Sequence, residues 1–116
     1  MKVYKFGGAS VKDANGVRNL HKIISNSNDN LVVVISAMGK TTNALELVVN
    51  SFFNHKSDTE ALLKKVVDYH ENIINDLFGA NRTEIDSHIN GLYEKINGIL
   101  SDKPSLSYDY EYDRIV

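Results

Sequence analysis

The first half of the chain alternates short apolar segments with patterns typical of helices. Val3 and Tyr4 suit a short strand, because β-branched and aromatic residues are enriched in strands. Leu31–Ile35 is a continuous apolar run, the pattern of a strand that is buried on both faces of a parallel sheet. Between these segments, residues 13–25 carry apolar side chains at helical spacing. The pattern therefore predicts an α/β fold that begins with a strand, a helix and a second strand.

The segment after the second strand has a helical period throughout. One amphipathic helix begins near Thr42 or Asn43, either of which could cap it. A longer helix starts at residues 57–60, whose S-x-x-E spacing is that of a capping box, and ends near Gly79. Its partner begins near Thr83 and carries a continuous apolar seam. The seam consists of Ile85, Ile89, Leu92, Ile96 and Ile99. The short link between the two helices predicts a long antiparallel helical hairpin.

Composition limits the partners and the setting of the protein. The 116 residues suffice for one domain, and a net charge of −2 with scattered Lys and Arg leaves no basic stripe for nucleic acid or anionic lipid. Cysteine is absent and the four histidines lack ligand spacing, so we expect no metal site. No apolar run reaches the length of a membrane span, and the start Met-Lys-Val lacks the apolar region of a signal peptide. We therefore expect a cytoplasmic protein that binds small molecules or other chains.

The segment Lys5-Phe6-Gly7-Gly8-Ala9-Ser10 combines the end of a strand with a cation, paired glycines and a hydroxyl group. The two glycines let the backbone turn sharply and approach a ligand with no Cβ in the way. Backbone N–H groups can then point at an anion, and the helix that follows would add the positive end of its dipole. By itself, a glycine pair before a helix also fits an ordinary turn. The full combination indicates a phosphate-binding turn.

A second turn, Ser36-Ala37-Met38-Gly39-Lys40-Thr41-Thr42-Asn43, follows the apolar strand. Its Gly-Lys-Thr sequence looks like the end of a P-loop, but that motif needs a glycine five residues before Gly39, and the chain has Val34 there, inside a strand. A dinucleotide-binding fingerprint is excluded as well, because the glycines at Gly7 and Gly8 are adjacent rather than spaced as G-x-G-x-x-G.

The two motifs, in this order and at this separation, closely resemble the amino-terminal signatures of aspartate kinases, in the amino acid kinase superfamily. The resemblance is strong over about the first 50 residues and loose beyond them. It implies the fold class: the amino-terminal part of an α/β/α sandwich, the amino acid kinase fold, with a long helical hairpin. It also implies three segments: residues 1–56 with both turns, residues 57–104 with the hairpin, and residues 105–116 as the start of a further substrate-binding segment.

The resemblance implies a reaction as well. Aspartate kinases use ATP with Mg²⁺ to phosphorylate the side-chain carboxylate of L-aspartate, which gives 4-phospho-L-aspartate at the start of lysine, threonine and methionine synthesis. ATP and L-aspartate would thus be the partners, with no tightly bound cofactor, no nucleic acid and no membrane. Ser36 and Thr42 match the serine and threonine of the second turn in the family, and by this resemblance they would hold L-aspartate.

On the phosphate side, the resemblance assigns roles to four residues of the first turn. Lys5 would neutralise charge on the transferring phosphoryl group, and Gly7 and Gly8 would donate backbone N–H groups to the phosphates of ATP. Ser10 would assist there, or would simply cap the following helix. Ala9 stands where the family most often has threonine or serine, so this chain lacks a hydroxyl group at that position.

The end of the chain gives two conflicting signals. Residues 108–116 alternate aromatic and acidic side chains, which favours a strand. In aspartate kinases, however, a segment like Asp113-Arg114-Ile115-Val116 opens a helix that leads to a Ser-x-Gly-Glu motif, which this chain does not contain. We therefore predict a loop over Ser105–Tyr112 and the start of a helix at Asp113.

Other interpretations stay open. A relative such as a glutamate or carbamate kinase would share the first turn, but Ser-Ala-Met-Gly followed by Thr-Thr-Asn favours aspartate. A non-catalytic interaction module built on the helical hairpin is a second alternative. We expect the 116 residues alone to lack kinase activity and to form a homo-oligomer, because strand edges would be open and Ile73 or Tyr93 could offer apolar contacts.

Overall fold

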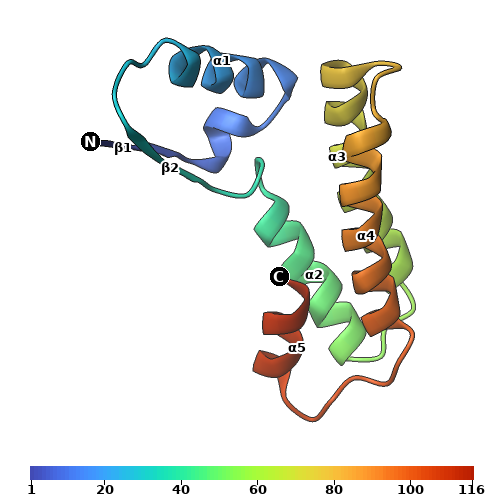
Figure 1. The fold of residues 1–116 in the computed structure, drawn as a ribbon. Helices are drawn as coiled ribbons and strands as arrows, with labels where there is room; N and C mark the ends of the chain where they lie inside the picture. Colours follow the sequence, from blue (N-terminus) through green and yellow to red (C-terminus); the bar gives the residue numbers. More distant parts are fainter. The chain divides into compact units, whose positions relative to one another are not determined.

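The computed structural model describes all 116 residues, which form two compact units, Met1–Thr41 and Thr42–Val116 (Figure 1). The first unit contains the sheet and one longer helix, and the second consists of helices. Apart from its first residue, helix α2 (Thr41–Phe53) belongs to the second unit. The three segments expected from the sequence, with breaks after residues 56 and 104, stay a prediction.

The first unit is a two-stranded parallel sheet with helices between its strands. In chain order, its elements are β1 (Lys2–Phe6), the short 3-10 helix η1 (Gly8–Val11), α1 (Ala14–Ser25) and β2 (Leu31–Ile35). Lys2 pairs with Leu31 and Phe6 with Ile35, so the strands pair along their whole length. The predicted strand, helix, strand order is confirmed.

The strand Leu31–Ile35 is not buried on both faces, contrary to the prediction. Val32 is 44% exposed and Val34 is 47% exposed, whereas Val33 between them is half-buried. Because this unit has only two strands and one longer helix, one face of the sheet has no layer to cover it. Val3, which pairs with Val32, extends the open apolar face. The homo-oligomer expected from such open surfaces stays a prediction.

Helix α1 begins as predicted, but its start corrects two expectations about the first turn. The carboxylate of Asp13 caps the helix by accepting a hydrogen bond of 2.8 Å from the N–H of Gly16. Ser10 therefore does not cap α1. Because η1 separates Gly8 from α1, and a helix dipole acts mainly within its first turn, the dipole of α1 does not reach an anion at Gly8.

The second unit contains α2, α3 (Thr59–Phe78), α4 (Thr83–Leu100) and α5 (Tyr108–Ile115). Helices α3 and α4 form the predicted antiparallel hairpin (Figure 1). Gly79 ends α3 as expected, with φ +55° and its N–H donating to the carbonyl of Asn75 at 3.0 Å. No helix of the chain combines the length and apolar character that a membrane span requires.

The core of the second unit lies where α2, α4 and α5 meet. Val49, Phe52 and Ile115 are buried at its centre. Four partly buried side chains pack around them: Leu45, Ile99, Leu100 and Tyr112. The hydroxyl of Tyr112 also donates to Oε1 of Glu46 at 3.0 Å, which ties α5 to α2. The terminal helix is thus part of the core rather than an appendage.

The capping box predicted at residues 57–60 does not form. Helix α3 begins at Thr59 after Asp58, and no side chain caps it. The buried hydroxyl of Ser51 on α2 instead donates to Oδ1 of Asp58 at 2.5 Å and lies 2.6 Å from the hydroxyl of Thr59. A contact with a residue in the preceding helix therefore replaces the local cap, so the start of α3 is shifted by two residues from Ser57.

The surface of the hairpin differs from the expectation. Ile73 is buried in the hairpin, so it cannot supply the exposed apolar contact that was expected of it. In the predicted seam of α4, Leu92 is 54% exposed, and no residue of this helix is fully buried. The helices that pack against α4 cover less than its full apolar stripe.

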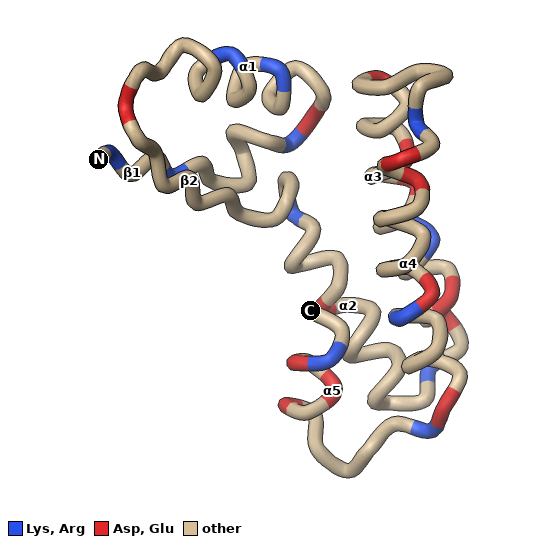
Figure 2. Tube along the Cα trace, in the orientation of Figure 1, with Lys and Arg blue, Asp and Glu red and all other residues tan.

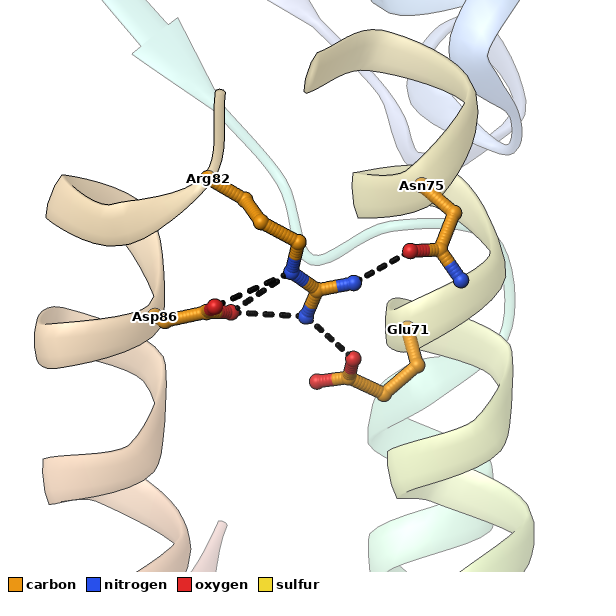
Figure 3. Close-up of polar contacts among 4 residues, drawn as sticks. All are labelled: Glu71, Asn75, Arg82 and Asp86. Atoms are coloured by element: carbon orange, nitrogen blue, oxygen red, sulfur yellow. Dashed lines mark hydrogen bonds and ion pairs between the residues drawn. The ribbon is translucent and has the colours of Figure 1, made fainter. Parts of the chain in front are cut away.

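A cluster of polar side chains, not anticipated from the sequence, ties the two helices of the hairpin together (Figure 3). Nε of Arg82 donates to the two carboxylate oxygens of Asp86 at 2.8 and 3.0 Å. The same guanidinium group reaches Glu71 and Asn75 on α3. The hydrogen bonds to Asp86 and Glu71 raise the pKa of Arg82. Nearby, burial raises the pKa of Tyr93 to about 12, and the charge of Glu71 adds to this rise.

The end of the chain folds as a helix five residues earlier than predicted. Ser107 caps α5 through a hydrogen bond of 3.2 Å from the N–H of Tyr110, so neither a strand nor a loop up to Tyr112 is present. The buried positions of this segment follow a helical period: Tyr112 and Ile115 face the core, and the side chain of Glu111 is fully buried. Glu111 accepts from the N–H of Ser105 at 3.0 Å, and this contact folds the preceding segment against the helix.

Glu111 is expected to make the stability of the second unit depend on pH. Burial raises the pKa of its carboxyl, but the N–H of Ser105 and the charge of Arg114 outweigh burial and leave the pKa below its usual value. A lowered pKa in the folded state stabilises the fold above the unfolded-state value of about 4.3, and this contribution is lost as pH falls through the folded-state value.

The measurement is urea unfolding of wild type and Glu111→Gln between pH 7 and pH 3. The difference in the free energy of unfolding between the two proteins should be largest at neutral pH and should shrink in the acidic range. A difference that is constant with pH, or that grows on acidification, would contradict the assigned role of Glu111.

Candidate functional site

The two turns singled out in the sequence lie together at one end of the sheet. Because β1 and β2 are parallel and in register, their carboxyl ends meet at the same edge, and each strand runs directly into one of the turns. The N–H of Ser36 donates to the carbonyl of Phe6 at 2.9 Å, and the N–H of Gly39 donates to the carbonyl of Gly8 at 3.0 Å. The structure thus brings the first turn into direct backbone contact with the second.

Gly8 lies where no other residue fits. A Cβ atom built on Gly8 would lie 2.5 Å from the carbonyl oxygen of Gly39 and 2.9 Å from that of Ala37. Both neighbours are backbone atoms, which cannot rotate away as the end of a side chain can. A Cβ atom built on Gly7, in contrast, meets nothing within 4 Å. The two glycines of the first motif therefore have different physical roles.

Three N–H groups of the first turn are not used in backbone hydrogen bonds. The carbonyl of Gly7 accepts from the N–H of Ser10 at 3.0 Å, and the carbonyl of Gly8 accepts from Gly39. No backbone acceptor engages the N–H of Gly7, Gly8 or Ala9. These three donors, on a segment without large side chains, are the groups that could bind an anion.

Lys5 and Ser10 lie on either side of the glycines. Lys5 is exposed on β1, where it pairs with Val34 of β2. Ser10 lies in η1, and its backbone carbonyl packs against α1 so closely that a Cβ on Gly16 would lie 2.4 Å from its oxygen. The hydroxyl of Ser10 is not used to cap α1, so it remains available on the exposed side of the turn.

In the second turn, the structure separates the roles of two adjacent threonines. Thr41 is buried, and its hydroxyl donates to the carbonyl of Met38 at 2.6 Å, so it holds the shape of the turn. Thr42 is exposed in the first turn of α2, and it is the first residue of the second unit. Ser36 is exposed in the first unit. Since α2 begins at Thr41, the prediction that Thr42 or Asn43 caps this helix is wrong.

Sequence reasoning missed three residues that shape the site: Gly16, Gly39 and Thr41. Gly39 has φ +56°, a left-handed conformation that favours glycine. Its place at the end of Ser-Ala-Met-Gly was visible in the sequence, but its contact with Gly8 was not, because the two residues are brought together only by the pairing of the strands.

Charge around the turns is moderate. Figure 2 shows Lys and Arg positions interspersed with Asp and Glu along both units, without a long run of either sign. An anion at the first turn would thus be held by local groups, such as backbone N–H donors and Lys5, rather than by a broad basic surface.

Residues 1–90 match the amino acid kinase family. In sequence, the chain is 35% identical over 103 residues to "Aspartokinase 2, chloroplastic" from Arabidopsis thaliana, a stretch that covers 84% of this chain and 18% of the plant protein. In structure, it is similar to the aspartate kinase of Clostridium acetobutylicum, with a TM-score of 0.69 and 22% sequence identity over 97% of this chain and 26% of that one. The chain thus spans about a fifth to a quarter of the length of these two proteins.

Proposed function

Because the chain belongs to the amino acid kinase family, we propose that it supplies the phosphate-binding and amino-acid-binding turns of an aspartate kinase. The proposed reaction transfers the γ-phosphoryl group of ATP, bound with Mg²⁺, to the side-chain carboxylate of L-aspartate. The product is 4-phospho-L-aspartate, at the start of lysine, threonine and methionine synthesis. The resemblance to aspartate kinases stated from the two motifs is confirmed at the level of sequence and fold.

The proposal rests on the contact between the two turns. The two turns that the resemblance assigns to different substrates are joined by the hydrogen bond from Gly39 to Gly8 at a single sheet edge. A transferase that joins two substrates needs their binding groups side by side, because rate depends on holding the reacting atoms in line and close together. Turns at opposite ends of the sheet would not have allowed this.

The first turn is proposed to hold the phosphates. Phosphoryl transfer needs little covalent help from the protein, and depends on position and on spreading positive charge over the transferred group. The N–H groups of Gly7 and Gly8 would donate to phosphate oxygens of ATP, and the ammonium group of Lys5 would neutralise charge that develops on the phosphoryl group. The exposed hydroxyl of Ser10 would add one further donor. Mg²⁺ would enter with ATP as part of the substrate.

The second turn is proposed to hold L-aspartate. Ser36 and Thr42 both carry exposed hydroxyl groups, which suit the ammonium and carboxylate groups of an amino acid. The nucleophile is the side-chain oxygen of the substrate, so neither residue needs activation. A cytoplasmic location and a homo-oligomeric state accompany this proposal as predictions from the sequence.

Ser36→Ala and Thr42→Val in the full-length protein are each expected to raise KM for L-aspartate by roughly tenfold, since each loses a hydrogen bond to the amino acid. KM for ATP should stay close to wild type. Thr83→Val is the matched control, because Thr83 is also an exposed threonine in the first turn of a helix but lies outside both turns. A raised KM for ATP with an unchanged KM for aspartate would show that the turns have been assigned to the wrong substrates.

The reaction itself is tested by trapping the acyl phosphate with hydroxylamine. The full-length protein with ATP and Mg²⁺ should form the hydroxamate of L-aspartate, and much less from L-glutamate. The 116 residues alone are expected to form none, because the chain spans only 18% of its plant relative. Preference for L-glutamate or carbamate would replace aspartate by another substrate of the family, and no hydroxamate from any of them would leave the alternative of a non-catalytic module.

A further inference from the structure

The hydrogen bond between the two turns has a consequence for how the first turn meets a phosphate. In a trans peptide, the carbonyl and the following N–H point in opposite directions, and every peptide bond of this chain is trans. The N–H of Gly39 donates to the carbonyl oxygen of Gly8 at an N···O distance of 3.0 Å, and this fixes the orientation of the Gly8–Ala9 peptide. The N–H of Ala9, on the opposite side of that peptide, therefore points away from the second turn. A residue of the amino-acid turn thereby orients a donor of the phosphate turn.

The geometry points to Gly39 as a positioning residue that sets the affinity of the first turn for a phosphate chain by holding the Gly8–Ala9 peptide. This inference rests on the proposed function and deepens it: Ala9 would contribute its backbone N–H to phosphate binding. Gly39 itself touches no phosphate and acts only through Gly8.

Two features make this contact specific to glycine at both ends. Gly39 has φ +56°, which side-chain-bearing residues other than asparagine and aspartate seldom adopt. Gly8 has carbonyl oxygens at 2.5 and 2.9 Å from the position of a Cβ, against 3.4–4 Å in ordinary contact. A side chain at Gly8 would therefore push the turns apart by about 1 Å and break the hydrogen bond.

Buried Thr41 supports the same arrangement from the other side. Its hydroxyl and its N–H both donate to the carbonyl of Met38, at 2.6 and 3.1 Å. This closes the turn that presents the N–H of Gly39. Hydrogen bonds within the second turn thus fix its shape, and the hydrogen bond from Gly39 to Gly8 links this fixed turn to the first turn.

The test uses the 116-residue chain and inorganic triphosphate with Mg²⁺ as the probe. Gly8→Ala should speed hydrogen exchange of the Gly39 amide by about tenfold and weaken triphosphate binding by about tenfold. Gly7→Ala should leave exchange at Gly39 unchanged, because its Cβ meets nothing within 4 Å. Gly98→Ala, in open space on α4, should leave both exchange and binding unchanged.

A second pair of variants keeps the inference testable if Gly8→Ala does not fold. Gly39→Asn should retain most of the affinity, since asparagine tolerates positive φ, whereas Gly39→Val should behave like Gly8→Ala. Both variants keep the N–H, so a difference between them reports on its placement.

The possible outcomes separate the positioning role of Gly39 from the proposed phosphate-binding function. Rapid exchange at Gly39 in wild type, or triphosphate affinity in Gly8→Ala or Gly39→Val within about twofold of wild type, overturns the positioning role and leaves the proposed function standing. If wild type keeps a protected Gly39 amide but binds no triphosphate, the proposed phosphate role of the turn fails, and the positioning role falls with it.

Discussion

Replacing Lys5 with methionine in the full-length protein is expected to lower kcat by about 10²–10³-fold, because loss of one preorganised charge at a transferring group costs on the order of 3–4 kcal/mol of transition-state stabilisation. KM values should change less, since the charge matters most when negative charge develops on the phosphoryl group. Lys5 is exposed on β1 and methionine has a similar length, so the substitution should leave the sheet intact.

The matched control is Lys2→Met on the same strand. Lys2 forms an exposed ion pair of 2.8 Å with Asp29, which is remote from the turns, so its loss should leave kcat unchanged. Steady-state kinetics with varied ATP and L-aspartate make the comparison. A kcat near the wild-type value in Lys5→Met would remove Lys5 from the chemistry.

Phe52→Ala is expected to destabilise the second unit by about 3 kcal/mol, because removal of a buried aromatic ring leaves a cavity among residues that relax only in part. Phe52 is 7% exposed and lies with Val49 and Ile115 at the point where α2 and α5 pack together. A loss of this size is a large fraction of the stability of a small unit, so α5 should detach well before the hairpin unfolds.

Urea unfolding followed by circular dichroism and by the exchange of α5 amides gives the measurement. Phe52→Leu is the control, since leucine fills most of the volume and should cost about 1 kcal/mol. If Phe52→Ala proved as stable as Phe52→Leu, Phe52 would lie outside the effective core and α5 would be held mainly by the hydrogen bond from Tyr112 to Glu46.

Elements that depend on local pattern were predictable from the sequence. The two strands, helix α1 and the hairpin of α3 and α4 follow from the hydrophobic period, although the cap of α1 is Asp13 and not Ser10. The two turns were recognisable because their glycines, lysine and hydroxyl residues are adjacent in sequence. Their closeness in space followed from parallel pairing, but the contact between Gly8 and Gly39 did not.

The failures share a physical cause, which is a partner distant in sequence. Ser51 on α2 replaces the capping box at the start of α3, and the buried Glu111 reaches back to Ser105 to support an early start of α5. In α5 the alternation of aromatic and acidic residues concealed a helical period, because its buried positions include a carboxylate that a hydrophobic pattern counts as polar.

The polar cluster around Arg82 illustrates the same limit. Arg82, Glu71 and Asp86 are ordinary charged residues of a helical hairpin in the sequence, and any of them could have faced solvent. The antiparallel packing of α3 and α4 brings Glu71 of α3 to the guanidinium group of Arg82 (Figure 3). Asp86 of α4 forms a second ion pair with the same group.

Amide shift mapping by NMR can show which substrate each turn binds. Addition of ATP with Mg²⁺ to the labelled 116-residue chain should shift the amides of Gly7, Gly8 and Ala9, with a smaller shift at Gly39 through its hydrogen bond to Gly8. Addition of L-aspartate should shift Ser36 and Thr42 instead. Shifts that appear at the opposite turns, or only in helices α3 and α4, or at no residue, would show that the two turns do not bind these substrates as proposed.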